Sequence, residues 1–244
     1  MSKRKHKKQA MELYGRVTRI AANDRLANDG ADARQSPGID HRDVPISDEI
    51  LATSIELSRV LDAKSQRLRE LPKMKKFRFQ LLHQWMLEHI EPCRVADIGG
   101  GKGLLAYLLR SSGWQTTVID PLRQELPGKY KDMKTGKQVR IADTESVPRL
   151  DRAFDSLMAE DFDLLVAMHA HGCNIRIIDA AAQFGRRFIV LPCCIIDEPV
   201  HPPVGMHWLQ YIVDYVTRKG FTVEPFRLNF KGQNIGLYAC SALR

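Results

Sequence analysis

The stretch from Val95 to Leu109, VADIGGGKGLLAYLL, constrains this chain more than any other. A short apolar run ends in an acid, Asp97, and alternate glycines follow at positions 99, 101 and 103, before leucines at helical spacing. Glycine is needed where a turn adopts positive φ or where a ligand approaches the backbone closely. The stretch therefore predicts strand, tight turn and helix, the first unit of a doubly wound α/β sheet. The N-terminus of that helix offers unpaired N–H groups to a polar ligand.

Two classes of cofactor use such a turn. Residues 101–106, GKGLLA, fit the dinucleotide fingerprint G-x-G-x-x-G/A, and an acid, Asp120, follows at roughly the expected spacing. The same glycines also read D-x-G-x-G-x-G from Asp97, and in this frame the chain resembles the class I S-adenosylmethionine (SAM) methyltransferases. A dehydrogenase turn that begins at Gly99 would need a glycine at position 104, where this chain has leucine. We therefore favour SAM over NAD and keep an NAD-dependent oxidoreductase as an alternative.

An alternation of strands and helices continues along the chain. The pattern predicts strands at residues 94–98, 116–119, 138–142, 163–168 and 187–191, and helices that end near 110 or span 175–184 and 206–219. Two last strands, 221–228 and 235–242, form a hairpin instead of another βα unit. This ending is typical of class I methyltransferases. The predicted fold class is therefore a Rossmann-like, doubly wound α/β sheet with a C-terminal antiparallel hairpin, preceded by a helical extension.

An acid closes each of the first three predicted strands: Asp97, Asp120 and Asp143. Ligands of open α/β sheets bind at this edge of the strands. The resemblance implies that Asp97, with Gly99, Gly101 and Gly103, holds the methionine part of SAM. It also implies that Asp120 holds the ribose hydroxyls and Asp143 the adenine amino group. The alternative is that the three acids are helix N-caps.

The loops after the fourth and fifth strands carry the remaining motifs. They read MHAHGCN over residues 168–174 and LPCC over residues 191–194. These loops resemble a methyltransferase branch with an H-x-C-G loop and a P-C-C loop, which includes the tRNA acceptor-stem 2′-O-methyltransferases and proteins with a glutathione-S-transferase C-terminal domain. The likeness covers residues 73–244 and departs at His171, where the branch usually has cysteine. The chain lacks the D/N-P-P-Y motif of amino-group methyltransferases.

Two histidines are the candidates for catalysis. Methyl transfer from a sulfonium is an in-line displacement, and a hydroxyl nucleophile must also lose its proton, a task that suits histidine near neutral pH. His169 and His171 alternate on an extended segment, so we expect His171 to face the substrate and His169 to point into the loop. The alternative is that both rings only order the backbone. Substrate contacts are predicted at Cys193, and at Lys75 and Lys76, which precede the first strand.

A metal site is a rival use of the same loops. His169, His171, Cys173, Cys193 and Cys194 offer the nitrogen and sulfur ligands that suit tetrahedral zinc. These loops have no C-x-x-C or H-x₃-H spacing, and adjacent cysteines seldom share one ion, so we expect no metal. A nucleophilic role for Cys193 lacks any partner in the sequence that would lower its pKa.

The charge of the chain is concentrated near its start. The formal net charge is +8 over 244 residues, and residues 1–20 and 64–79 each carry seven Lys or Arg against one acid. Such segments indicate a polyanionic partner. We expect residues 1–45 to be a basic, largely disordered tail, 46–91 to be a helical extension, and 92–244 to be the SAM-binding domain.

These features lead to one functional prediction. No apolar run approaches the ~18 residues of a membrane span, the start of the chain lacks the apolar core of a signal peptide, and five cysteines, an odd number, argue against a disulfide framework. We predict a cytoplasmic SAM-dependent methyltransferase that acts on RNA, tRNA first, and binds it through the basic N-terminal segments. The alternatives are a methyltransferase for a protein or a small molecule, and a non-catalytic RNA-binding module that retains the fold.

Overall fold

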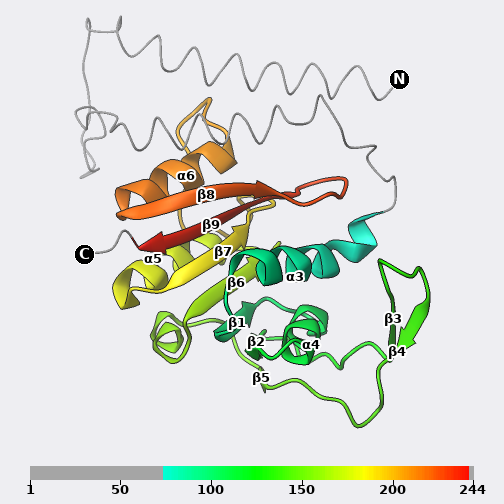
Figure 1. Ribbon diagram of the computed structural model, residues 1–244. Coiled ribbons are helices and arrows are strands. Elements are labelled where there is room, and N and C mark those ends of the chain that lie inside the picture. Colours follow the sequence, from blue (N-terminus) through cyan, green and yellow to red (C-terminus); the bar gives the residue numbers. More distant parts are fainter. Residues whose placement is uncertain (1–73, 242–244) are drawn as a thin grey trace, which may run out of the picture.

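The computed structural model describes residues 74–241 of the chain, and within them a seven-stranded sheet carries helices on both faces (Figure 1). The basic tail, the helix expected from Ser47 and most of the 46–91 extension lie outside the described residues. None of the helices between residues 74 and 241 is long and apolar enough to cross a membrane.

The sheet has the strand order β5-β2-β1-β6-β7-β9-β8. Its parallel strands are β1 (Arg94–Ile98), β2 (Gln115–Ile119), β5 (Arg149–Leu150), β6 (Leu164–Met168) and β7 (Arg187–Leu191). The last two strands, β8 (Phe221–Arg227) and β9 (Ile235–Ser241), form an antiparallel hairpin, and β9 also pairs antiparallel with β7. The predicted doubly wound sheet with a C-terminal hairpin is therefore confirmed. Its strand order reverses between β1 and β6, the point at which open α/β sheets bind ligands.

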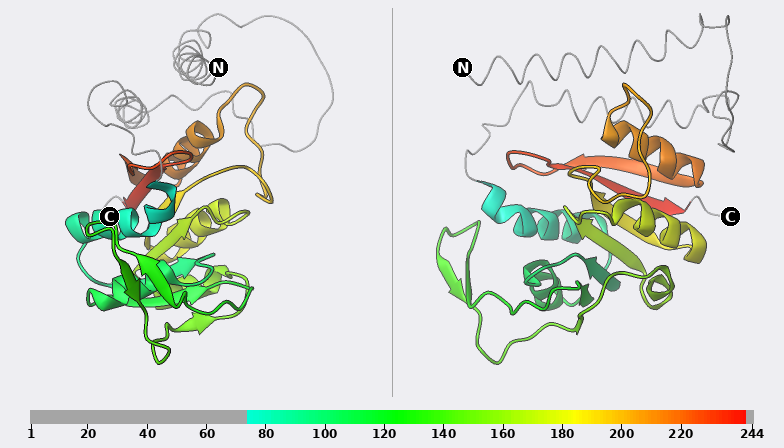
Figure 2. Two further views of the ribbon diagram at one scale, coloured as in Figure 1. Left: turned by 90° about the vertical axis from the view of Figure 1, so that its right-hand side faces the viewer. Right: turned by 180° about the vertical axis from the view of Figure 1, so that it is seen from behind.

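Alternate side chains of the central strands enter two hydrophobic clusters, because successive residues of a strand point to opposite faces. Val95 and Val166 pack under η2 (Met74–Phe77), α3 (Arg78–His89) and α4 (Leu104–Ser111). Ala96 and Leu165 pack under η3 (Ser156–Asp161), α5 (Asn174–Phe184) and α6 (Trp208–Arg218). Figures 1 and 2 show the two groups of helices on opposite sides of the sheet.

The helix predicted over residues 75–90 is present as η2 and α3, and it packs on the sheet. Leu82 and Met86 are completely buried. Trp85 stacks on Phe226 of β8, with ring centroids 3.9 Å apart. The helix α3 therefore shares its core with β1, β6 and β8.

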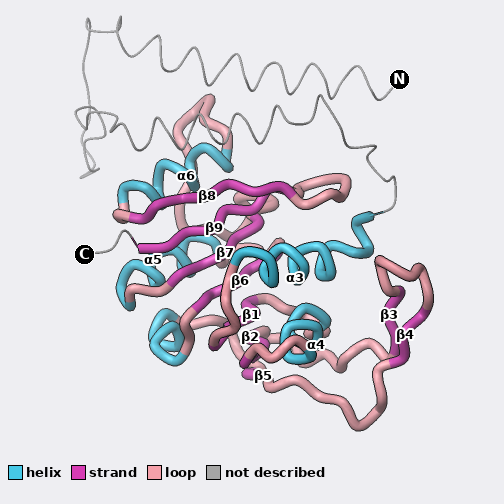
Figure 3. Tube along the Cα trace, in the orientation of Figure 1, coloured by secondary structure: helices cyan, strands magenta, loops and turns pink. Residues whose placement is uncertain are grey.

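The prediction for the third strand of the sheet is wrong. Residues Gln138–Arg140 form β4, which pairs with β3 (Lys129–Lys131) in a separate antiparallel hairpin (Figure 3). The third parallel strand is instead β5, which pairs with β2. Each of these strands has only one half-buried residue, Tyr130 or Val139, between two exposed ones, whereas the central strands of the sheet are buried. Because β5 has only two residues, its sequence is too short to show any periodicity.

Candidate active site

The glycine turn joins β1 to α4 through three residues of positive φ: Gly99 (+66°), Gly101 (+54°) and Gly103 (+76°). Close packing excludes side chains at two of them. A Cβ on Gly99 would lie 2.7 Å from the Cβ of Ala170, and one on Gly103 would lie 2.9 Å from Cγ2 of Val147. At Gly101 the nearest atom to such a Cβ would be 3.7 Å away. The backbone at Gly101 is therefore the side of the turn that a ligand can approach.

Asp97 lies beneath this turn and is only 2% exposed. Its Oδ2 has no hydrogen-bond partner among residues 74–241, and a Cβ on Gly100 would come within 2.5 Å of that oxygen. Burial raises the pKa of Asp97 from 3.8 to about 7; a hydrogen bond from the backbone of Ala106 opposes this rise, and the nearby charge of Asp120 adds to it. A buried carboxylate oxygen without a donor is unfavourable. The site therefore suits a ligand that brings a donor or a positive charge.

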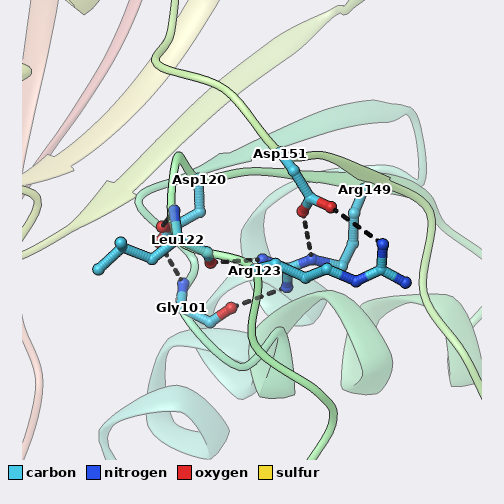
Figure 4. Close-up of polar contacts among 6 residues, drawn as sticks. All are labelled: Gly101, Asp120, Leu122, Arg123, Arg149 and Asp151. Atoms are coloured by element: carbon cyan, nitrogen blue, oxygen red, sulfur yellow. Dashed lines mark hydrogen bonds and ion pairs between the residues drawn. The ribbon is translucent and has the colours of Figure 1, made fainter.

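Asp120, directly after β2, fixes the open side of the turn (Figure 4). Its Oδ2 accepts a hydrogen bond of 2.8 Å from the amide of Gly101, and its Oδ1 accepts one of 2.9 Å from the amide of Leu122. The side chain is buried. Asp97, Asp120 and the three glycines, all predicted as cofactor residues, are thus brought together at one edge of the sheet.

Arg149 of β5 holds the other polar group of Gly101 (Figure 4). Its Nη1 donates to the carbonyl oxygen of Gly101 over 2.8 Å, and its Nη2 donates to that of Leu122 over 3.2 Å. Its Nε donates to Oδ1 of Asp151 over 3.2 Å, and Arg123 approaches the second oxygen of Asp151 at 3.8 Å. Sequence reasoning missed Arg149, because the only signal was an arginine in a strand too short to recognise.

The predicted position of Asp143 is wrong. This residue is exposed and follows β4, which belongs to the separate hairpin, so it does not close a strand of the main sheet. The acid that follows the third sheet strand is Asp151, which is linked to the glycine turn through Arg149. The expectation for Asp143 depended on the strand assignment and loses its basis with it.

The two predicted histidines have different surroundings in the loop after β6. His169 has a positive φ of 59°, its Nε2 lies 2.7 Å from the carbonyl oxygen of Gln233, and its ring packs edge-on at 6.0 Å from Phe230. His171 is exposed, and both of its ring nitrogens lie 3.9 Å from Sγ of Cys194. Ala170, between them, is the residue that packs against Gly99. The loop is therefore adjacent to the glycine turn.

The cysteines after β7 face each other and the loop of His171. Sγ of Cys193 and Sγ of Cys194 are 3.6 Å apart. Burial, followed by the hydrogen bond and charge of the Cys194 thiol, raises the pKa of Cys193 to about 11. At neutral pH the Cys193 thiol therefore stays protonated in the absence of a cation, which argues against a nucleophilic role.

Glu198 is a positioning residue that sequence reasoning also missed. It is buried, with one oxygen accepting hydrogen bonds from the backbone amide and the side-chain amide of Asn174, at 3.0 and 2.6 Å. Its other oxygen accepts from the amide of Ile175 at 3.1 Å. The carboxylate thus caps the N-terminus of α5 and holds the end of the loop that carries the histidines. No local pattern links residues 198 and 174, so the sequence held no signal for it.

The hairpin of β3 and β4 forms a second polar region, which we call the basic hairpin (residues 129–140). It carries five Lys or Arg against one acid, and all five are exposed: Lys129, Lys131, Lys134, Lys137 and Arg140. No ion pair joins any of them to another residue of the described segment. Gln80 of α3 holds the hairpin, donating to the carbonyl oxygen of Lys131 at 2.8 Å and accepting from the amide of Met133 at 2.7 Å.

Of the predicted substrate lysines, Lys76 is exposed in η2, directly before α3, the helix that carries Gln80. Its Nζ lies 4.8 Å from the centroid of the Phe77 ring. The side chain of Lys75 is outside the described atoms. These two lysines belong to η2, whereas His171 and Cys193 belong to the loops after β6 and β7.

The strand order and the glycine turn at the β1–β6 reversal define the fold as that of the class I methyltransferases. No protein-family model matches the chain. A segment of 103 residues, 41% of the chain, is 31% identical to "Probable tRNA (uracil-O(2)-)-methyltransferase" of Homo sapiens and covers 12% of that protein. The corresponding protein of Mus musculus is 29% identical over 103 residues, with 13% of its length covered. The matched segment thus spans only about an eighth of these curated relatives.

Solved structures with similar folds include two methyltransferases. The ribosomal protein L11 methylase of Lactobacillus delbrueckii subsp. bulgaricus is 18% identical, with 66% of this chain and 77% of that chain covered at a TM-score of 0.39. The magnesium protoporphyrin IX methyltransferase of Synechocystis PCC 6803, solved with bound SAM, is 11% identical, with 82% of this chain and all of that chain covered at a TM-score of 0.41.

Proposed function

We propose that the chain is a SAM-dependent methyltransferase. The observation that carries this proposal is the buried Oδ2 of Asp97, which has no partner within residues 74–241 and lies beneath a glycine turn at the reversal of the strand order. A cationic donor stabilises such a carboxylate, and the α-ammonium group of SAM is one. A dinucleotide would instead bring a pyrophosphate to this turn. Its negative charge would lie next to Asp97 and Asp120, which disfavours the NAD alternative.

In this proposal each residue at the turn contacts a different part of the cofactor. When bound, SAM supplies a methyl group on a positively charged sulfur. Asp97 and the glycine turn would hold its methionine part. Asp120 would hold the ribose hydroxyls, because each carboxylate oxygen has a lone pair left beyond the amide it already accepts from. Asp151, rather than Asp143, would accept a hydrogen bond from the adenine amino group.

The chain's own contribution to transfer would be alignment of the acceptor with the methyl group. The ring of His169 is engaged with the carbonyl oxygen of Gln233, whereas His171 is exposed beside the glycine turn. His171 is therefore the better candidate of the two predicted catalytic residues, with Cys193 beside it as a substrate contact.

We propose RNA, tRNA first, as the substrate, and the cytoplasm as the compartment. The names of both relatives refer to tRNA. The basic hairpin has five exposed cations, and residues 1–20 and 64–79 each carry seven Lys or Arg in the sequence. In this proposal the tail (1–45) and the extension (46–91) add phosphate contacts, and residues 92–244 carry the cofactor. Methyltransferases for proteins or small molecules, and a non-catalytic RNA-binding module, are the competing functions.

Two measurements on the full chain test the proposal. Titration calorimetry should show SAM binding that Asp97→Asn weakens strongly and Asp143→Asn, an exposed acid, leaves unchanged. Methyl groups from labelled SAM should then appear in the tRNA fraction of a lysate and be released as nucleotides by nuclease. Binding of NAD but not SAM would overturn the cofactor assignment. Label found in protein or small molecules alone would overturn the choice of RNA, and RNA binding without any transfer would identify a non-catalytic module.

A further inference from the structure

Three ligand groups from two loops meet at the carboxyl edge of the sheet. His171 belongs to the loop after β6, and Cys193 and Cys194 to the loop after β7. The two strands end level with each other, because Met168 pairs with Leu191. The ligand atoms of the three residues all lie within 4.8 Å of one another.

Their spacing fits a tetrahedral ion. Bonds of about 2.3 Å from zinc to sulfur and about 2.05 Å to nitrogen require tetrahedral edges of about 3.8 Å between two sulfurs and about 3.5 Å between sulfur and nitrogen. The two sulfurs are 3.6 Å apart, and Sγ of Cys194 lies 3.9 Å from the ring nitrogens of His171. The third edge, from Sγ of Cys193 to the ring of His171, is bounded by 4.8 Å. The His171 ring must therefore turn one nitrogen toward the two thiols to place one ion among the three groups.

The expectation of no metal relied on the absence of C-x-x-C or H-x₃-H spacing and on the rule that adjacent cysteines seldom share one ion. A physical reason for that second rule is that adjacent side chains diverge. That rule holds in a strand, where successive residues point to opposite faces. Cys193 and Cys194 lie just beyond the end of β7, in a segment of irregular backbone after Pro192. Their thiols converge there, so the rule does not apply to this pair.

We propose that His171, Cys193 and Cys194 form a site for a thiophilic divalent ion, zinc first, with one coordination position left open. Zinc binding forms two S–Zn bonds and one N–Zn bond, and the two thiol protons pass to solvent. Two thiolates and a neutral imidazole balance the charge of Zn²⁺, so the complex is neutral in this half-buried place. No fourth His, Cys, Asp or Glu of residues 74–241 joins the group. Three protein ligands with an open position are typical of catalytic rather than structural zinc.

The site lies next to the glycine turn, since Ala170, the neighbour of His171, packs against Gly99. If the proposed methyltransferase function holds, on which this step rests, the open position takes an oxygen of the substrate. His171 is then a metal ligand and not the proton acceptor, and the ion favours loss of the hydroxyl proton as a Lewis acid.

Metal binding to the reduced, chelator-washed full chain tests the site without any methyl transfer. We expect one zinc per chain. His171→Ala, Cys193→Ser and Cys194→Ser should each weaken zinc binding by about 100-fold or more, since loss of even an outer-shell partner costs 10–100-fold. Cys173→Ser and Cys240→Ser are matched controls, because both thiols are also free and half-buried, and they should bind zinc normally. With Co²⁺, the thiolate-to-metal absorption should fall by about half in either serine variant of the pair, as expected for two equivalent thiolate ligands.

Several results would overturn the site. One is wild-type protein with all five thiols reduced that takes up no zinc or cobalt. Another is full cobalt absorption retained in Cys193→Ser or in Cys194→Ser. Circular dichroism of each variant separates loss of a ligand from loss of the fold. SAM calorimetry on the same protein separates the two proposals. A chain that binds SAM but takes up no zinc would overturn only the ion site, and a chain that binds zinc but not SAM would overturn only the cofactor assignment.

Discussion

The guanidinium of Arg149 donates to the carbonyl oxygen of Gly101 over 2.8 Å, and these two residues, 48 positions apart, tie β5 to the glycine turn. Asp120 accepts from the amide of the same glycine at 2.8 Å. Both polar groups of Gly101 are therefore held by charged side chains. The amide of Gly103 also donates to the carbonyl oxygen of Gly100 over 2.9 Å. The shape of the turn at Gly101 therefore depends on this backbone bond and on the two side-chain bonds.

Replacing Arg149 should loosen the turn and weaken SAM binding. Arg149→Met removes charge-assisted hydrogen bonds that are each worth about 1.5–3 kcal/mol, so we expect a loss of roughly tenfold or more in SAM affinity by calorimetry. Arg123→Gln is the control, because the Arg123 side chain is 84% exposed and meets Asp151 only at 3.8 Å. Exposed pairs of this kind contribute about 0–1 kcal/mol. Equal losses in the two variants would show that charge alone, and not the clamp on Gly101, supports binding.

Asp97 should make SAM binding depend on pH. Its pKa in the free protein is about 7, and a cationic ligand favours the carboxylate. Binding below pH 7 therefore releases a proton, and affinity should rise as pH increases, by up to about tenfold per pH unit, levelling off above 7. Calorimetry in buffers of different ionisation enthalpy counts the protons released. In Asp97→Asn this proton release should vanish, and its persistence would assign the titration to another group.

The same pKa has a consequence for stability in the absence of ligand. A carboxyl group whose pKa is raised in the folded state binds its proton more tightly there than in the unfolded chain. The contribution of protonated Asp97 to the free energy of unfolding is therefore complete below pH 3.8 and is lost as pH rises through about 7. We expect the free energy of unfolding to fall over this window in the wild type, relative to Asp97→Asn. Denaturant titrations at pH 5 and pH 8 measure the difference.

The sequence predicted what depends on local pattern. The glycine turn, the buried strand β6 and the C-terminal hairpin each occupy one continuous stretch with its own periodicity or turn residues. The errors fall where the structure depends on distant contacts. Residues 138–140 pair with β3 in a separate hairpin, and the choice of β5 in their place depends on its pairing with β2.

The residues of the candidate site likewise fall into those that local pattern predicted and those that depend on distant contacts. Asp97 and Asp120 were found because acids at strand ends have meaning for a parallel sheet. Arg149 and Glu198 were not, because their partners Gly101 and Asn174 lie 48 and 24 positions away. The convergence of Cys193 and Cys194 depends on irregular backbone, which composition does not reveal.

Glu198 should support the fold as well as the loop of the histidines. Glu198→Ala removes three hydrogen bonds to the start of α5 and leaves their donors buried, so we expect a loss of about 2–4 kcal/mol in the free energy of unfolding. Glu198→Gln keeps the shape and one acceptor, and should lose about half as much. Urea titration followed by circular dichroism measures both. A wild-type midpoint in Glu198→Ala would contradict the capping role.

The basic hairpin should contribute phosphate contacts to RNA binding. Lys134 and Lys137 are exposed near its tip, away from the bonds that Gln80 makes to Lys131 and Met133. Lys134→Gln/Lys137→Gln should therefore leave the fold intact. Each phosphate contact adds roughly 0.7–0.9 to the slope of log K against log salt, so the double variant should lower that slope by up to about 1.5. Fluorescence anisotropy with labelled tRNA at several salt concentrations gives the slope.

The matched control removes two charges elsewhere. Arg176→Gln/Arg218→Gln changes exposed residues of α5 and α6, on the opposite face of the sheet from α3. Its net charge equals that of the hairpin variant, so non-specific attraction falls equally in both. Only a site-specific contact gives the hairpin variant a lower slope of log K against log salt than the control. Equal slopes would reject the hairpin as an RNA contact and leave the basic segments 1–20 and 64–79 in that role. Removal of residues 1–20 should then lower the slope of log K against log salt.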